Sequence, residues 1–154
     1  MRAKQYLQQI EKIDKIIQNK IIEKEQWFAI ATNTTSQIGG ERVQSSVSQQ
    51  KMADATERYF EISQEIDRYI DSLINTKKEV ISTIEQLPPT EYDVLHKVYI
   101  GIIVSDDDPK MVRYLSLEEV ADMYKKSYPW ATSVHGRALK HVQDILDERK
   151  NDNE

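Results

Sequence analysis

The chain has 154 residues, with 21 Lys and Arg against 26 Asp and Glu, for a net charge of −5. It has no Cys, which excludes disulfides and thiolate zinc sites. Only 4 Gly and 4 Pro occur, so the composition favours helices over strands. No window approaches the roughly 18 apolar residues of a membrane span, and the N-terminal stretch lacks the apolar core of a signal peptide. We therefore expect an all-α cytoplasmic protein that makes no membrane contact.

Residues 2–32 have the periodicity of a long helix. Apolar side chains recur at steps of three and four residues, which places them on one helix face: Leu7, Ile10, Ile13, Ile17 and Ile21. The pattern stops at residues 33–48, where Gly39-Gly40 and many Ser, Thr and Asn predict a loop.

Residues 49–87 contain a heptad repeat with two apolar seams. The seams are Met52, Tyr59, Ile66, Leu73, Val80 and Leu87, and Ala55, Ile62, Tyr69, Thr76 and Thr83. A single helix cannot bury such a stripe alone. We expect residues 1–87 to form a helical hairpin within the chain or a coiled coil between chains, and to hold a homo-oligomer together. A docking surface for another protein is the alternative. The residues expected to oligomerise are Leu7, Ile10, Ile17, Ile21, Met52, Tyr59, Ile62, Ile66, Tyr69, Leu73 and Val80.

Leu87-Pro88-Pro89 predicts a helix end and a domain boundary, because proline removes a backbone donor and restricts the residue before it. We expect a second domain over residues 88–150 and a frayed tail at 151–154. The first helix of this domain is expected to be capped by Thr90 and to run to about Ile103. Its inward residues are expected to be Tyr92, Leu95, Val98 and Tyr99. A polar connection, residues 104–114, is expected to follow.

The stretch from Ser116 to Val142 has the layout of a helix-turn-helix. Ser116 is expected to cap the first helix, with Glu119 at the spacing of a capping box. Ser127 is expected to cap the second helix, whose first turn tolerates Pro129. The facing apolar residues of the two helices are Leu117, Val120, Ala121 and Tyr124, and Ala131, Val134, Ala138, Leu139 and Val142.

The segment Lys125–Gln143 carries four basic residues and no acid, although the chain as a whole is acidic. Such a local field favours a polyanion, and basic side chains in the turn and along the helix are placed to contact phosphates. Trp130 fits the core and the interface equally well, and Pro129 has no donor to offer a base. The expected DNA-binding residues are Lys125, Lys126, Ser127, Tyr128, Trp130, Thr132, Ser133, His135, Arg137, Lys140 and His141.

The second domain resembles the promoter-reading fourth region of bacterial sigma factors. The resemblance lies in Leu87-Pro88, Leu117-Glu118-Glu119-Val120-Ala121, Ser127 and Arg137-Ala138-Leu139-Lys140. The string Val134-His135-Gly136-Arg137-Ala138-Leu139, preceded by a long helical region, is similar to the ArpU-like phage proteins. This resemblance implies a regulator of late or packaging genes of a phage or prophage, acting in a bacterial host cell.

We therefore expect a sequence-specific DNA-binding transcriptional regulator that binds double-stranded DNA as a homo-oligomer. The alternative is an adaptor that binds RNA polymerase or another phage protein, with DNA contact secondary. We find no Gly-rich phosphate loop and no nucleophile–base arrangement, so we expect neither an enzyme nor a cofactor. The three His are scattered, and Asp106-Asp107-Asp108 lacks the spacing of a calcium loop, so we expect no metal site.

Overall fold

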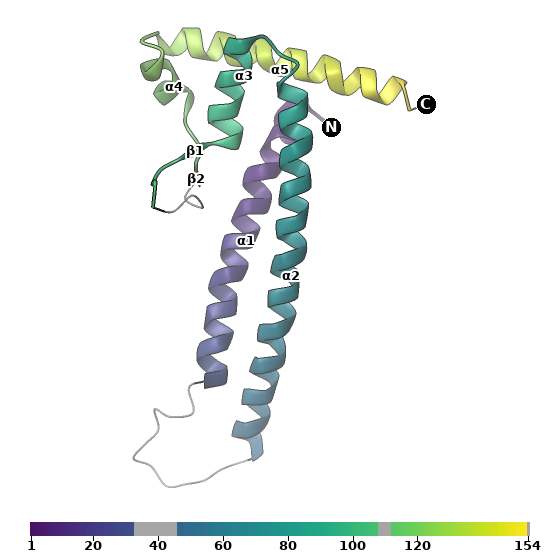
Figure 1. Ribbon diagram of the computed structural model, residues 1–154, viewed down its shortest axis with the longest axis vertical. Coiled ribbons are helices and arrows are strands. Elements are labelled where there is room, and N and C mark those ends of the chain that lie inside the picture. Colours follow the sequence, from purple (N-terminus) through teal and green to yellow (C-terminus); the bar gives the residue numbers. More distant parts are fainter. Residues whose placement is uncertain (33–45, 108–111, 154) are drawn as a thin grey trace. The chain divides into compact units, whose positions relative to one another are not determined.

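The structure is a computed structural model that describes residues 1–32, 46–107 and 112–153 (Figure 1). It is all-α, as predicted, and this part of the chain contains five α-helices. They are α1 (Ala3–Thr32), α2 (Ser46–Ile84), α3 (Pro89–Leu95), α4 (Leu117–Met123) and α5 (Tyr128–Asn151). A π-helical turn, η1 (His96–Ile100), and two short strands, β1 (Ile102–Ile103) and β2 (Val112–Arg113), lie between α3 and α4. Most of the expected loop at 33–48 lies outside the described residues, and α2 begins at Ser46.

The chain divides into two compact units. One, the hairpin unit, comprises residues 13–73, and the other, the terminal unit, comprises residues 1–12 and 74–154. Both α1 and α2 contribute to each unit. The last turns of α2 cluster with the helices that follow them, on both sides of Pro88. The expected domain boundary at Pro88 stays a prediction.

In the hairpin unit, α1 and α2 run antiparallel (Figure 1). Lys20 of α1 binds Glu65 of α2 at 2.6 Å. Further along α1, Phe28 lies against Tyr59, which is earlier in α2, with ring centroids 5.6 Å apart. The predicted seam is buried between the two helices at Ile17, Ala55, Ile62 and Ile66. At these positions the apolar stripe is covered within a single chain, whereas Ile21, also expected in the stripe, is exposed.

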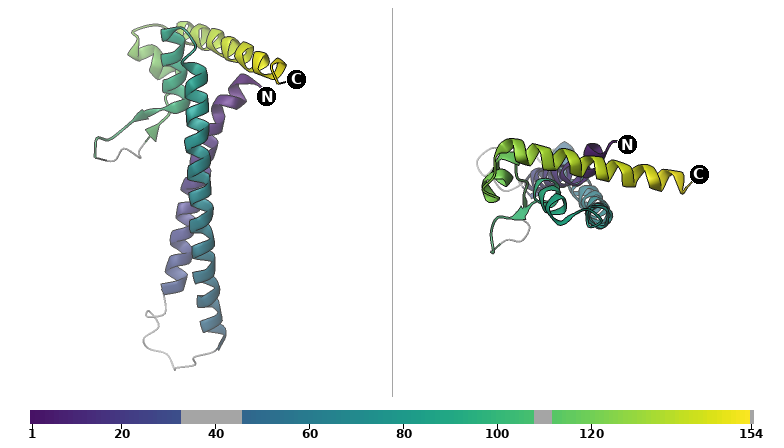
Figure 2. Two further views of the ribbon diagram at one scale, coloured as in Figure 1. Left: turned by 45° about the vertical axis from the view of Figure 1, so that its right-hand side comes forward. Right: turned by 90° about the horizontal axis from the view of Figure 1, so that it is seen from above.

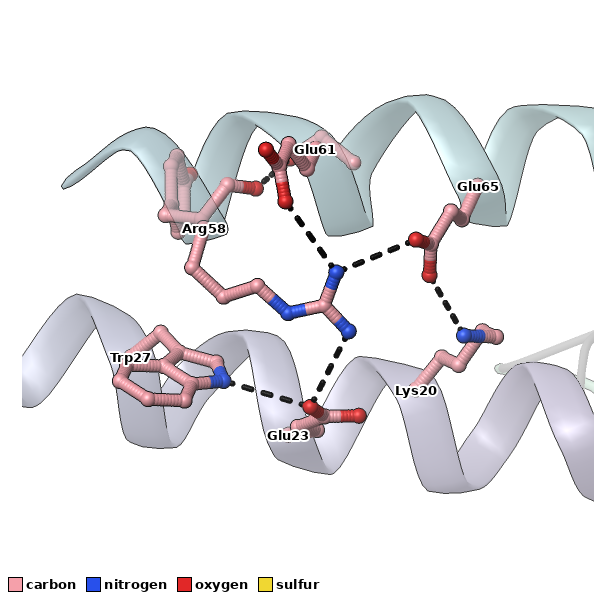
Figure 3. A network of polar contacts seen from close by, with 8 residues as sticks. Lys20, Glu23, Trp27, Arg58, Glu61 and Glu65 are labelled. Atoms are coloured by element: carbon pink, nitrogen blue, oxygen red, sulfur yellow. Dashed lines mark hydrogen bonds and ion pairs between the residues drawn. The ribbon is translucent and has the colours of Figure 1, made fainter. Parts of the chain in front are cut away.

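A polar network borders this seam (Figure 3). Arg58 binds Glu65 at 3.1 Å on its own helix and Glu23 of α1 at 3.5 Å. Hydrogen bonds from Lys20 and then Arg58 hold the pKa of Glu65 below its ordinary value. These side chains are partly exposed, so the network contributes little to the stability of the fold.

In the terminal unit, the first turns of α1 pack on the last turns of α2. The Tyr6 and Thr83 hydroxyl oxygens lie 2.9 Å apart in a buried hydrogen bond. The Ala3 N–H donates to Gln143 Oε1 of α5 at 2.8 Å. The apolar residues buried here are Ala3, Leu7, Ile10, Val80, Ile84 and Leu87. The start of α1 is therefore held against α5.

The region around Pro88 differs in detail from the prediction. α2 ends at Ile84, because the Leu87 N–H turns back to the Ile84 carbonyl at 3.0 Å. Pro88 precedes α3 as its N-cap residue and no side chain caps it, so the prediction that Thr90 caps this helix is wrong. The expected inward residues Leu95 and Tyr99 are buried, whereas Tyr92 and Val98 are only half-buried.

The helix expected to reach Ile103 ends at Ile100. Gly101 has φ 92°, a left-handed conformation that breaks the helical path. β1 then pairs antiparallel with β2, with Ile102 opposite Arg113 and Ile103 opposite Val112. A Cβ at Gly101 would lie 2.5 Å from Val112 Cγ1 and 2.8 Å from the Arg113 carbonyl oxygen. The strand pair therefore requires glycine at this position.

Candidate nucleic-acid interface

α4 and α5 pack with α3 around one apolar cluster. Val94, Leu115, Val120 and Val134 form its centre, and Val98, Ile102, Leu117, Tyr124 and Trp130 pack around it. On α5, Ala131, Ala138 and Val142 are also fully buried. These positions confirm the predicted inner faces of the two helices, with Leu139 at their half-buried edge.

Both helix starts have the predicted caps. The Ser116 hydroxyl accepts the Glu119 N–H, and the Ser127 hydroxyl accepts the Trp130 N–H. The Glu119 carboxylate binds Arg113 at 2.6 Å. α5 includes Asn151, the first residue of the expected frayed tail, and backbone hydrogen bonds continue to Asn153.

The turn between α4 and α5 is closed by two backbone bonds of the Schellman type. The Lys126 N–H donates to the Ala121 carbonyl at 2.9 Å, and the Lys125 N–H donates to the Asp122 carbonyl at 3.1 Å. Lys125 has φ 54°, in the left-handed region where glycine is the usual residue. The turn thus projects two lysines next to the start of α5.

The four predicted phosphate contacts are exposed on this surface: Lys125, Lys126, Arg137 and Lys140. None of them forms an ion pair within the described ranges, whereas Arg113 is paired with Glu119. Ser133 and Tyr128 are also exposed, and Thr132 uses its hydroxyl to bond the Pro129 carbonyl at 2.9 Å. The surface is therefore a set of free cations with few base-reading groups among them.

Trp130 lies on the core side. It is partly buried against the apolar cluster, and its ring centroid is 5.1 Å from that of Tyr124. The Tyr124 hydroxyl donates to Asp93, which Lys97 also binds. Burial, followed by the Asp93 hydrogen bond, raises the pKa of Tyr124 to about 12. Burial opposes ionisation of Asp93, but the hydrogen bonds from Lys97 and Tyr124 outweigh it and hold the pKa of Asp93 low. Trp130 thus belongs to a contact that joins α3, α4 and α5.

His135 does not lie on the outer face, where it was expected. Its Nε2 is 2.8 Å from the Tyr99 hydroxyl, and the two rings stack with centroids 5.8 Å apart. Burial, with a smaller contribution from the charge of Lys4, lowers the pKa of His135. Burial also raises the pKa of Tyr99 to about 12. Both rings are therefore neutral packing partners at neutral pH.

His141 has a partner within the chain, although its side chain is 47% exposed. Its Nδ1 lies 2.6 Å from Glu91 Oε2, and Glu91 is buried at the start of α3. Glu91 could not be recognised from the sequence, because its contact is with a residue of α5 that lies 50 positions away. The position of His141 is explained by its contact with α3.

Three further basic residues, which were not among the predicted DNA-binding residues, lie next to the exposed cations of α5. Arg2 and Lys4, at the start of α1, and Lys150, near the end of α5, line a groove that also contains Lys140. Only the packing of α1 on α5 brings these residues together.

Within residues 1–32, 46–107 and 112–153, no three potential ligands gather as a metal site would require. Asp106 and Asp107 are exposed, and Asp108 lies outside the described residues. Over the same ranges, every helix is too short or too polar to cross a bilayer. No protein-family model, curated protein or solved structure matches the chain.

Proposed function

We propose that the chain is a DNA-binding transcriptional regulator that uses α4 and α5 as a helix-turn-helix. One observation carries the proposal. In an acidic chain, the turn and outer face from Lys125 to Gln143 carry four exposed cations and no carboxylate, on a capped helix packed against a second helix. The affinity of proteins for DNA depends mainly on neutralising the charge of the phosphates. Unpaired basic side chains on this helix are therefore what DNA binding requires.

In this proposal Lys125 and Lys126 bind phosphates beside the helix start, and Arg137 and Lys140 bind phosphates along it. Ser133 and Tyr128, which are both exposed, contact base edges. A hydroxyl can form a hydrogen bond with several different bases, so these contacts distinguish weakly between DNA sequences. The resemblance to ArpU-like proteins supports late or packaging genes of a phage or prophage as the regulated genes.

Oligomerisation supplies the affinity that one such module lacks, because joining two modules makes the second binding event intramolecular. The seam formed by Leu7, Ile10, Ile62 and Val80 is buried within the chain and is not free to bind another copy. Among the expected contacts, Ile21 is 41% exposed, and Phe60 on α2, which was not expected to take part, is 61% exposed. We propose that copies associate through such side chains left open on the hairpin unit.

The test measures binding of the full chain to a random-sequence DNA duplex over a range of salt concentrations. Lys126→Gln with Arg137→Gln should make the slope of log affinity against log salt shallower by about two, because about 0.9 is lost per phosphate contact. Lys51→Gln with Lys78→Gln is the matched control, since it removes the same charge from exposed positions of α2. Wild-type protein that ignores DNA at low salt would refute the proposal and favour the adaptor. Equal effects of the two double variants would place DNA on another surface.

A further inference from the structure

We infer that the groove between the start of α1 and the outer side of α5 is a second phosphate-binding surface for duplex DNA, continuous with the helix-turn-helix. The groove has a volume of about 810 Å³. Its lining includes Arg2 and Lys4 of the α1 end, and Lys140 and Lys150 of α5. The inference rests on the proposed function, and it adds a region that the helix-turn-helix motif does not contain.

The groove has a strong excess of positive charge. The four basic side chains are all exposed, and none of them forms an ion pair in the part of the chain that the structure describes. Asp147 is the sole carboxylate of the lining, and it accepts a hydrogen bond from Gln143 at 3.0 Å. The first turn of α1 contains no acidic residue, so the positive end of its dipole is not offset there.

The start of α1 is fixed against α5 rather than loosely adjacent to it. The Ala3 N–H bonds Gln143 Oε1, and Ala3 is 5% exposed. Figure 2 shows the purple start of α1 beside the yellow part of α5 in both views. Lys4 is also close enough to His135, in the first half of α5, for its charge to lower the pKa of that ring.

Lys140 connects the two surfaces. It faces outward one turn after Arg137, and it also lines the groove with Arg2 and Lys4. A phosphate strand that follows α5 past Arg137 therefore meets Lys140 and then the groove. The α1 end would act as a backbone clamp beside the recognition helix, holding the register of the duplex without reading bases.

The chemistry of the groove favours an extended polyanion over a single bound phosphate. A site for one phosphate converges several donors on a point, commonly at a glycine-rich turn. Here long, flexible side chains are spread along an open groove, which suits successive phosphates of a nucleic acid backbone.

The experiment uses the full chain and the random-sequence duplex. Arg2→Gln with Lys4→Gln removes the α1 cations and leaves Lys140 in place. We expect the salt slope to become shallower by about 0.9 for each lost contact, as it should on replacing Lys126 or Arg137. Lys51→Gln with Lys78→Gln again controls for net charge, and circular dichroism checks that each variant keeps its helices.

A gain-of-affinity variant makes the test independent of any folding defect. Asp147→Asn removes the lining carboxylate while an amide oxygen remains for Gln143, so DNA binding should tighten at low salt. A slope unchanged by Arg2→Gln with Lys4→Gln, together with unchanged affinity of Asp147→Asn, would overturn the inference and leave the proposed function intact. Wild-type protein that does not bind DNA would overturn both.

Discussion

Replacing Lys125 by glycine should stabilise the protein while weakening its binding to DNA. Lys125 is the one non-glycine residue with positive φ in the described parts of the chain, at 54°, and it closes the turn between α4 and α5. Its backbone conformation therefore opposes stability, whereas its exposed ammonium group is available to a phosphate. One substitution separates these two contributions.

The magnitude follows from the conformation. A left-handed backbone costs a non-glycine residue about 1–2 kcal/mol. Glycine avoids this cost, but it destabilises the folded state by about 0.5–1 kcal/mol, because the unfolded chain with glycine loses more conformational entropy on folding. The difference between the midpoints of these two ranges makes Lys125→Gly stabilising by about 0.75 kcal/mol. For a chain of this size, that raises the melting temperature by about 1.5–3 °C. If the proposed function holds, the salt slope of DNA binding should become shallower by about 0.9 for the loss of the proposed phosphate contact.

Urea unfolding followed by circular dichroism measures the stability, and the duplex titration measures the slope. Lys125→Gln removes the charge but keeps a side chain in the left-handed conformation, so it should change the slope alone. Lys126→Gly removes a neighbouring charge where φ is not positive, so it should bring no stabilisation. If Lys125→Gly is less stable than wild type, the left-handed backbone at Lys125 does not destabilise the folded protein as we infer.

Three further changes test other parts of the structure. His141→Ala removes the partner of the buried Glu91 carboxylate and should lower the unfolding free energy by about 1 kcal/mol without changing the salt slope; a shallower slope would return His141 to the DNA surface. Because burial lowers the pKa of His135, the folded protein binds fewer protons than the unfolded chain, so this contribution to stability is complete above about pH 6.5 and is lost as the pH falls through the folded pKa. His135→Gln should therefore reduce the fall in stability on acidification, and an unaltered pH profile would contradict the buried position of the ring. Phe60→Ser should lower the molar mass found by light scattering if Phe60 lies between copies, and an unchanged mass would exclude it from that contact.

Features that depend on neighbouring residues could be predicted from the sequence. The caps at Ser116 and Ser127 bond backbone groups three residues away, so their signals lie within one turn. The buried side chains of the hairpin unit, Ile17, Ala55, Ile62 and Ile66, all belong to the predicted stripes, because burial there repeats with the helix period. The same periodicity did not show that Ile21 is 41% exposed or that Met52, Tyr59, Tyr69 and Leu73 are only half-buried.

Features that depend on tertiary packing could not be predicted. The pairing of Ile102 with Arg113 depends on a residue across a connection, whereas the end of the helix before Ile103 had a local signal in Gly101. His135 is spaced as an outward residue, but its partner Tyr99 lies 36 positions earlier on another element. The sequence pattern suits Trp130 equally to the core and to the interface, and its contact with Tyr124 in the apolar cluster places it on the core side.

The same gap explains the incomplete list of candidate DNA contacts. Arg2 and Lys4 read as ordinary charges on a long helix, and no pattern within α1 distinguishes them from Lys12 or Lys15. Their place beside α5 depends on the bond between the Ala3 N–H and Gln143, which joins residues 140 positions apart. A motif search confined to the helix-turn-helix cannot find such residues.

The two tryptophans give each compact unit its own optical reporter. Trp27 lies in the hairpin unit, where its Nε1 donates to Glu23 at 3.3 Å (Figure 3). Trp130 packs on Tyr124 in the terminal unit. Changing either one to phenylalanine leaves a single tryptophan, so tryptophan fluorescence can follow the melting of one unit at a time. Because α1 and α2 pass without a break from one unit into the other, the loss of structure in one should propagate along shared helices. The two single-tryptophan proteins should then report coincident transitions.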